Sequence, residues 1–408
     1  MAAGISCKPL AIAATVALLC LSAVGSVAAP VPVILDSSSK GGSKIAFWDK
    51  QRRGTNCFNS ASTRQWWVAA KDAGIEMVRL APDKWTSEKR DFLIGDADHY
   101  DGLIEADFRR LKSALDTASS VGMPVVLTML SLPGARWRQN NGGEADLRLW
   151  RDTTYWTQAA RFWRDLATRL RKHPAIVGYN LLNEPTPELA APNAGPSAIP
   201  AAWYAGVQHT AADLNEFYRK VTEAIRAVDD QTPIVLDAGS WANPTAFAYL
   251  KPVGDDRTLY DFHMYDPWEF TNQKANGGRF CFPGTMIAES GEKVTLDLDL
   301  LRKILTPVTD WQNRHAIPAH RVIAGEFGCH RTSCGAADYV SDLMQIFNEQ
   351  RWHWAFYSFR EDTWDGMDYE LGDKPPGATY WDALKKGKKP TLPRVKNRTW
   401  DAIRAQLR

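Results

Sequence analysis

Two glutamates in this chain each follow an apolar, strand-like run and stand directly before or near a turn-forming residue. Glu184 lies in the segment 179–185 (YNLLNEP), and Glu326 lies in the segment 321–328 (RVIAGEFG). A buried strand that stops at a carboxylate places that group at the edge of a sheet. Two such carboxylates, if brought to one site, form the pair that cleaves a glycosidic bond.

That chemistry makes different demands on the two carboxyl groups. A nucleophile must stay ionised, so it needs a nearby cation and hydrogen-bond donors that lower its pKa. An acid must stay protonated near neutral pH, so it needs a less polar setting or a neighbouring negative charge. Arg79 can meet the first need. The charge on Glu326 can meet the second, because carboxylates about 5 Å apart resist simultaneous ionisation.

Other polar residues also fall at the ends of strand-like runs: Arg79, Asn183, His263 and Tyr265. Any one of them alone would more often be part of a structural ion pair or a capped loop. Together with the two glutamates they favour a single site at one face of a sheet.

The elements that must position these residues alternate along the chain. The expected strands are 54–56, 76–80, 125–130, 176–182, 234–236, 259–263, 322–324 and 354–358. The expected helices are 62–73, 108–121, 154–172, 211–228, 300–314 and 337–350. Eight strands with intervening helices predict one α/β domain, a closed (β/α)8 TIM barrel, with its site at the carboxyl ends of the strands. An open doubly wound sheet is the alternative, but no GxGxxG motif follows the first strand.

Four places in this pattern are irregular. The helix between the fifth and sixth strands is poorly marked, because 241–254 contains several Pro and Gly residues. Pro307 lies inside the fifth helical stretch, where it predicts a kink or a helix start. Segments 188–202 and 277–291 read as long loops on the carboxyl face of the barrel.

The composition excludes some classes of partner. With 408 residues and a net charge of +2, the chain gives no electrostatic reason to expect nucleic acid or an anionic surface. Its 17 tryptophans are compatible with a carbohydrate cleft, although most are expected in the core. No GxSxG or P-loop motif points to an esterase or a nucleotide-binding enzyme.

The N-terminus has the layout of a secretory signal peptide. Lys8 precedes an apolar run over 9–27, and small residues occupy 24–29. We therefore expect a signal peptide over 1–29, a catalytic domain over 30–408, and a secreted or periplasmic protein. No other segment is long and apolar enough to span a bilayer, so stable membrane association is not expected.

Four of the six cysteines would remain after cleavage, and an even number in an exported chain suggests disulfides. Cys329 and Cys334 could close a small loop, which would leave Cys57 with Cys281 as a long-range pair. Zinc is the alternative, but no CxxC motif or nearby His pair supports it.

Four segments, in order along the chain, carry a family resemblance: 78–80 (VRL), 183–185 (NEP), 263–265 (HMY) and 325–328 (GEFG). The set resembles glycoside hydrolase family five, a group of retaining β-glycanases on a β/α barrel. The resemblance implies that Glu184 is the acid/base and Glu326 the nucleophile.

The same resemblance implies roles for the neighbours of the two glutamates. Asn183 would bind the sugar 2-hydroxyl, and Tyr265 would orient the nucleophile. His263 would position the acid/base or a sugar hydroxyl, and Arg79 would keep Glu326 ionised.

The sequence departs from the family pattern in two places. No His ends the third strand, where Ser131 or Trp137 could take its place. No Trp directly follows the eighth strand, so Trp364 is expected to be the sugar-stacking platform, with Phe359 second. Trp268 is expected to be another cleft aromatic.

The sequence therefore predicts a secreted, monomeric, retaining hydrolase of a β-linked polysaccharide, working without a metal or organic cofactor. β-1,4-Glucan is the first choice of substrate, and β-mannan, β-1,3-glucan and shorter glycosides stay open. The alternatives from other classes are a non-catalytic carbohydrate-binding barrel and a metal-dependent lyase or isomerase. The latter would use Glu184, His263 and Glu326 as ligands.

Overall fold

The structure is a computed structural model that describes residues 44–190, 201–287, 291–362, 364–388 and 390–407. The expected signal peptide lies outside these residues. Among the described residues, no helix is both long and apolar enough to cross a bilayer.

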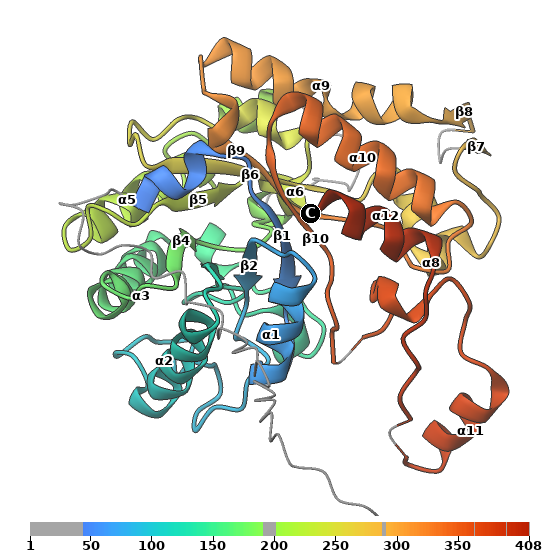
Figure 1. Cartoon of the computed structure of the whole chain (residues 1–408). Coiled ribbons are helices and arrows are strands. Elements are labelled where there is room, and N and C mark those ends of the chain that lie inside the picture. The colour runs from blue at the N-terminus through green and yellow to red at the C-terminus, as the bar shows by residue number, and fades with distance from the viewer. Residues whose placement is uncertain (1–43, 191–200, 288–290, 363, 389, 408) are drawn as a thin grey trace, which may run out of the picture.

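Eight parallel strands close into a barrel, which confirms the predicted TIM-barrel fold (Figure 1). Around the barrel the strands are β1 (Arg53–Cys57), β2 (Met77–Leu80), β3 (Val125–Thr128), β4 (Ile176–Asn180), β5 (Ile234–Asp237), β6 (Thr258–Met264), β9 (Val322–Phe327) and β10 (His353–Phe356). Apart from Arg53, every residue in these strands is buried. This burial on both faces explains why the strands read as continuous apolar runs instead of alternating ones.

The barrel interior has an apolar lower half and a polar upper half. Side chains from seven strands fill the lower half: Met77, Val126, Val177, Val235, Leu259, Ile323 and Ala355. Trp48, from the short helix η1 (Lys44–Asp49), packs against them and donates from Nε1 to the carbonyl of Val177 at 2.9 Å. With the lower end filled, the polar residues gather at the carboxyl ends of the strands.

Helices surround the strands (Figure 1), and those of nine residues or more bury apolar side chains. The helices are α1 (Arg64–Asp72), α2 (Glu105–Ser120), α3 (Thr153–Leu170), α4 (Ala201–Gly206), α5 (Leu214–Arg226), α6 (Gly239–Ala242), α7 (Trp268–Thr271), α8 (Gln273–Asn276), α9 (Leu298–Arg314), α10 (Ala336–Gln350), α11 (Ala378–Lys385) and α12 (Arg398–Gln406). Further 3-10 turns are η2 (Arg138–Asn140), η3 (Arg148–Trp150), η4 (Pro187–Ala190), η5 (Ala246–Tyr249), η6 (Ala319–Arg321) and η7 (Tyr369–Leu371).

The irregular places in the sequence have distinct outcomes, and most of the predicted loop over 188–202 lies outside the described residues. Between β5 and β6 the chain forms only α6 and η5, in agreement with the weak helical pattern there. Helix α9 starts at Leu298, capped by Asp297, and continues through Pro307, so Pro307 is not a helix start. The loop after β6 holds α7, α8 and an antiparallel hairpin, β7 (Gly284–Ile287) with β8 (Lys293–Leu296).

The disulfide joins Cys281 to Cys334, so both predicted pairings, Cys329 with Cys334 and Cys57 with Cys281, are wrong. Cys57 ends β1 and is buried. Cys329 is also buried, and its backbone exchanges two hydrogen bonds with the hydroxyl of Tyr369. Cys334 instead lies beside Cys281 of the loop after β6. Proximity in sequence therefore did not decide the pairing.

Candidate active site

Six barrel strands contribute polar residues to one site at their carboxyl ends. The strand register places Asn56 beside Arg79, Asp237 beside Asp261 and His263 beside Glu326. The segment after β4 adds Asn183 and Glu184. The prediction that the strand-end residues share one face of the barrel agrees with this geometry.

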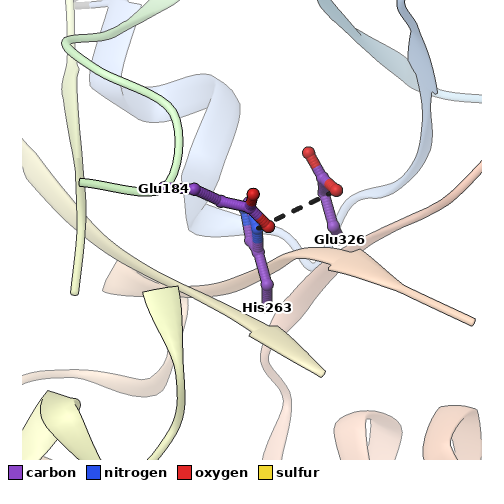
Figure 2. Close-up of side chains that lie close together, drawn as sticks. All are labelled: Glu184, His263 and Glu326. Atoms are coloured by element: carbon purple, nitrogen blue, oxygen red, sulfur yellow. Dashed lines mark hydrogen bonds and ion pairs between the residues drawn. The ribbon is translucent and has the colours of Figure 1, made fainter. Parts of the chain in front are cut away.

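The two glutamates converge on His263 (Figure 2). One oxygen of Glu184, one oxygen of Glu326 and one ring nitrogen of His263 all lie within 4.8 Å of one another. Carboxyl groups in retaining glycosidases are about 5–5.5 Å apart, whereas inverting enzymes need about 6.5–9.5 Å to admit a water. The observed spacing fits the retaining geometry.

Glu326 is buried and receives two strong donors. Nη1 of Arg79 donates to Oε1 at 2.6 Å, and the hydroxyl of Tyr265 donates to Oε2 at 2.8 Å. Burial, and to a smaller extent the charge of Glu184, raises the pKa of Glu326 above its ordinary value, and the charge of Arg79 and the hydrogen bond from Tyr265 oppose that rise. The sequence predicted a lowered pKa for this carboxyl. That prediction is wrong in direction because loss of water outweighs the donors.

Glu184 is partly exposed and has a left-handed backbone, with φ at 50°. Its backbone N–H donates to Oδ2 of Asp237 at 3.0 Å, and its Oε1 lies 2.9 Å from Nδ1 of His263. Burial raises the pKa of Glu184 to about 7, Arg79 opposes the rise, and the charge of Asp237 adds to it. The direction agrees with the sequence prediction. Burial is the less polar setting expected from the sequence as one of two causes, whereas the neighbouring charge that raises the pKa is that of Asp237 instead of Glu326.

Arg79 connects the two halves of the site. Its Nη2 donates to Oδ1 of Asn180 and to Oδ1 of Asn183, both at 2.7 Å. Nη1 also donates to Oδ1 of Asn56 at 3.1 Å. One buried guanidinium thus fixes the position of the Asn183 amide relative to the Glu326 carboxylate.

Sequence reasoning missed four residues of this network: Asn56, Asn180, Asp237 and Asp261. Asp237 could have been found, since it ends an apolar strand in the same way as the two glutamates. Asp261 is two residues before His263 on the same strand, and alternation along a strand would have placed both on one face. The two asparagines carried no comparable signal.

Residues 39–363 match the protein family described as Cellulase (glycosyl hydrolase family 5). The chain belongs to this family. It is therefore a glycoside hydrolase, and the family resemblance read from the four sequence segments is confirmed.

The relatives of this family 5 chain are distant and carry several names. Endoglucanase C of Acetivibrio thermocellus is 22% identical over 323 residues, which cover 74% of this chain and 79% of that protein. Cellodextrinase A of Ruminococcus flavefaciens is 24% identical over 215 residues, 52% of this chain and 54% of that protein. Beta-xylosidase of Phanerodontia chrysosporium is 21% identical over 297 residues, 68% of this chain and 54% of that protein.

Solved structures share the fold of this family 5 chain. Endoglucanase Cel5A from Thermotoga maritima aligns with a TM-score of 0.57 and 18% identity, over 78% of this chain and 93% of that one. A hyperthermophilic endo-beta-1,4-glucanase in complex with substrate aligns with a TM-score of 0.56 and 18% identity, over 80% of this chain and 96% of that one.

The aromatic residues singled out in this family 5 sequence have different surroundings. Trp364 is 45% exposed, and its ring centroid lies 6.3 Å from that of Tyr357 at the end of β10. The backbone N–H of Tyr357 donates to the carbonyl of Phe327, the residue after Glu326, so Tyr357 borders the site. Trp268, at the start of α7, is 56% exposed.

Phe359 cannot be the stacking platform, which corrects the second choice made from the sequence. Its side chain is buried between the rings of Trp66 and Trp400. Ser131, one of the two candidates to replace the missing histidine, is also buried, and its Oγ accepts the backbone N–H of Trp137. Trp137, the other candidate, is partly buried.

Two groupings in this site could hold a metal by distance alone: Glu184, His263 and Glu326; and Asp237, Asp261 and His263. Arg79 donates directly to Glu326 and lies 3.5 Å from Asp237. A guanidinium so close to both groupings repels a second cation. The charge distribution therefore favours a site that works through its own carboxyl groups.

Proposed function

We propose that this glycoside hydrolase cleaves β-1,4-glucan by double displacement, with Glu326 as the nucleophile and Glu184 as the acid/base. The observation that carries the proposal is that Glu326 and Glu184, although close together, have different hydrogen-bond partners. Glu326 accepts from Arg79 and Tyr265, which stabilise its anion. Glu184 faces His263 and keeps its proton to higher pH.

In the first step, an oxygen of Glu326 attacks the anomeric carbon while the bond from that carbon to the leaving oxygen breaks. Glu184 gives its proton to the leaving oxygen, and a glycosyl ester on Glu326 forms. In the second step, Glu184 takes a proton from water, the water oxygen attacks the anomeric carbon, and Glu326 leaves as a carboxylate.

The neighbours support these steps by position. The amide of Asn183 is fixed by Arg79 and lies next to Glu184 in the chain, where it can bind the hydroxyl beside the reacting carbon. Tyr265 holds Oε2 of Glu326, which leaves Oε1 with Arg79 and fixes the rotation of the carboxylate. Trp364 and Trp268 are exposed aromatic surfaces on which sugar rings can stack.

The choice of β-1,4-glucan rests on the relatives, which include endoglucanases and a cellodextrinase beside a beta-xylosidase. A panel of carboxymethyl cellulose, glucomannan, laminarin, xylan and aryl glycosides tests it. The highest kcat/KM is expected on carboxymethyl cellulose or glucomannan. A preference for laminarin or xylan would remove β-1,4-glucan as the main substrate.

The variant Glu326→Gln tests the catalytic assignment. It keeps the side-chain shape but removes the nucleophile, so we expect kcat to fall by about 10⁴-fold or more. Oligosaccharide affinity, measured by calorimetry, should change little. Glu223→Gln, on the exposed face of α5, is the matched control and should retain full activity. Substantial turnover by the Glu326 variant would contradict the assignment.

We also propose that the chain is exported. The apolar run over 9–27 and the disulfide between Cys281 and Cys334 both support an oxidising destination. N-terminal sequencing of the protein from the native cell should find a first residue near position 30. An intact N-terminus on the active intracellular protein would contradict export.

A further inference from the structure

A buried polar cluster lies below the two glutamates, inside the barrel. We call it the lower cluster; it consists of Asp237, Asp261 and His263, none more than 2% exposed. Two of its atoms, Oδ2 of Asp261 and Nε2 of His263, have no hydrogen-bond partner among the described residues, and they lie 3.9 Å apart. Oδ2 of Asp237 is slightly nearer to Nε2 of His263, at 3.7 Å, but it already accepts from the backbone N–H of Glu184 and from Arg79. Because an unpaired buried polar atom costs free energy, Oδ2 of Asp261, which has no donor, is the better partner for Nε2.

The two aspartates of the lower cluster differ in their donors. Asp237 accepts from Asn180 Nδ2 at 2.6 Å, from the backbone of Glu184 at 3.0 Å and from Arg79 Nη2 at 3.5 Å. Asp261 accepts on Oδ1 alone, from the backbone of Gly325 at 2.6 Å. Nε of Arg79 is 3.9 Å from Oδ2 of Asp261, but that N–H donates to Asn180 at 3.1 Å. Asp237 therefore has three donors and Asp261 has one, and the poor supply of donors suits a neutral Asp261.

The balance of charge around Asp261 points the same way. The titratable and charged groups that face it are Arg79 of β2, Tyr218 of α5, Asp237 of β5, His263 of β6 and Glu326 of β9. One guanidinium thus lies within 4 Å of three carboxyl groups, those of Asp237, Asp261 and Glu326. Burial, and then the charge of Asp237, raises the pKa of Asp261 well above its ordinary value, and burial lowers the pKa of His263.

The tautomer of a neutral His263 decides where the proton of Glu184 lies. If Nε2 accepts from Asp261, the imidazole proton is on Nδ1, which donates to Oε1 of Glu184 across 2.9 Å. The proton of the acid must then be on Oε2. In the other tautomer, Nδ1 accepts, and it draws the proton of Glu184 onto Oε1 and away from the leaving group.

We propose that Asp261 is a positioning residue for Glu184. In its neutral form it donates from Oδ2 to Nε2 of His263, directly after a small shift or through one bridging water. His263 then keeps its proton on Nδ1, and Glu184 presents its transferable proton on Oε2. The inference rests on the proposed role of Glu184 as acid/base.

The variant Asp261→Asn is the first test. Asparagine keeps the acceptor for Gly325 and places an N–H, which can only donate, where neutral Asp261 has its O–H. We expect kcat/KM on an aryl glycoside with a poor leaving group to stay within about threefold of the wild type, with an unchanged alkaline limb of the pH profile. A loss of about thirtyfold or more, or a shifted alkaline limb, would show that Asp261 acts as an anion and would overturn the proposal.

The variant Asp261→Leu removes the donor and keeps the branched heavy-atom skeleton. We expect kcat to fall by about tenfold or more on the poor leaving group but by less than about threefold on a dinitrophenyl glycoside, whose departure needs no acid. Equal losses on the two substrates would indicate a merely structural role and overturn the proposal. Asp229→Asn, a buried aspartate outside the site, is the control and should not change the ratio between the substrates.

Nitrogen-15 NMR of histidines in the full chain gives a reading that does not depend on whether a variant folds. With His263 assigned by its loss in His263→Gln, we expect a protonated Nδ1 and an unprotonated Nε2. The reverse assignment would overturn the proposal. Failure of the proposed function is recognised separately, because Glu184→Gln would then keep full activity on the poor leaving group whatever Asp261 does.

Discussion

At the scale of single residues, two side chains of the same type are given different chemistry by their neighbours. Glu326 lies between a guanidinium and a phenol, both of which donate to it. Glu184 has a histidine on one oxygen, and its backbone donates to the aspartate that raises its pKa. Burial acts on both carboxyl groups, so the difference between them comes from the donors.

The raised pKa of Glu184 predicts how activity depends on pH. The acid works only when it is protonated, so kcat/KM should fall as pH rises through about 7. A pH profile of the wild type on an aryl glycoside with a poor leaving group measures this limb. A plateau that extends well beyond pH 8 would contradict the assignment of Glu184, since about one pH unit above its pKa most of the acid is ionised.

The same shift predicts a pH-dependent stability. The pKa of Glu184 is about 7 in the folded chain and ordinarily 4.5, so between these values the unfolded chain releases a proton that the folded chain keeps. The stability that this group contributes is complete below pH 4.5 and is lost as pH rises to 7. Because Gln does not titrate, Glu184→Gln should become progressively more stable than the wild type across this window. Thermal unfolding of both proteins from pH 4 to 8 measures this change in relative stability. A stability difference that does not vary with pH would contradict the raised pKa of Glu184.

At the scale of elements, the loops on the carboxyl face supply surfaces that the barrel strands do not. Trp268 is on α7, in the loop after β6, and Trp364 follows β10. Both are exposed, and we propose that both stack on sugar rings remote from the bond that is cleaved.

Substituting either tryptophan with Ala should therefore weaken the binding of polysaccharide more than it slows the chemical step. A stacked aromatic contributes about 0.5–1.5 kcal/mol, which corresponds to a rise of about two- to twelvefold in KM on polysaccharide. Turnover of a small aryl glycoside should change much less. Trp381→Ala is the matched control, because Trp381 is 50% exposed on α11, which stands apart from the barrel (Figure 1). An effect of Trp381→Ala equal to the others would remove the stacking roles.

The disulfide also connects separate elements, since it joins the loop after β6 to the segment before α10. Cys281 and Cys334 are 53 residues apart, and closing a loop of that length contributes about 4 kcal/mol in the chain-entropy picture. Replacing both cysteines with Ala should lower the free energy of unfolding by up to that amount. Denaturant unfolding with and without reductant measures it. Reductant should destabilise the wild type and leave the double variant unchanged.

At the scale of the whole molecule, the barrel brings residues from strands distant in sequence to one rim. The spacing of Glu184 and Glu326 predicts the stereochemistry of the product, because carboxyl groups this close leave no room for a water between them and the sugar. NMR of the first products should show the β-anomer, and early appearance of the α-anomer would exclude double displacement. Activity should also survive exhaustive chelation, and its loss would favour the metal-dependent alternative.

Much of this architecture could be predicted from the sequence, because the signals were local. A strand buried on both faces needs a continuous apolar run, and eight such runs separated by helical patterns leave few folds. Arg79, Glu184, His263 and Glu326 each end or follow such a run, so their arrival at one rim follows from the fold. Asp237 also follows an apolar run, since it comes one residue after the expected strand 234–236.

Contacts between elements were decided by the tertiary structure alone. Which cysteines pair depends on where the loop after β6 lies, and sequence spacing carries no information on that position. The direction of the pKa shift at Glu326 depends on how completely water is excluded, which no motif records. The proximity of Asp261 to His263 and Arg79 depends on strand register and barrel closure, including the irregular register between β6 and β9 at Phe262 and His263. Local composition can place a residue on a strand, but only the packed molecule determines which side chains it meets and how much water remains around them.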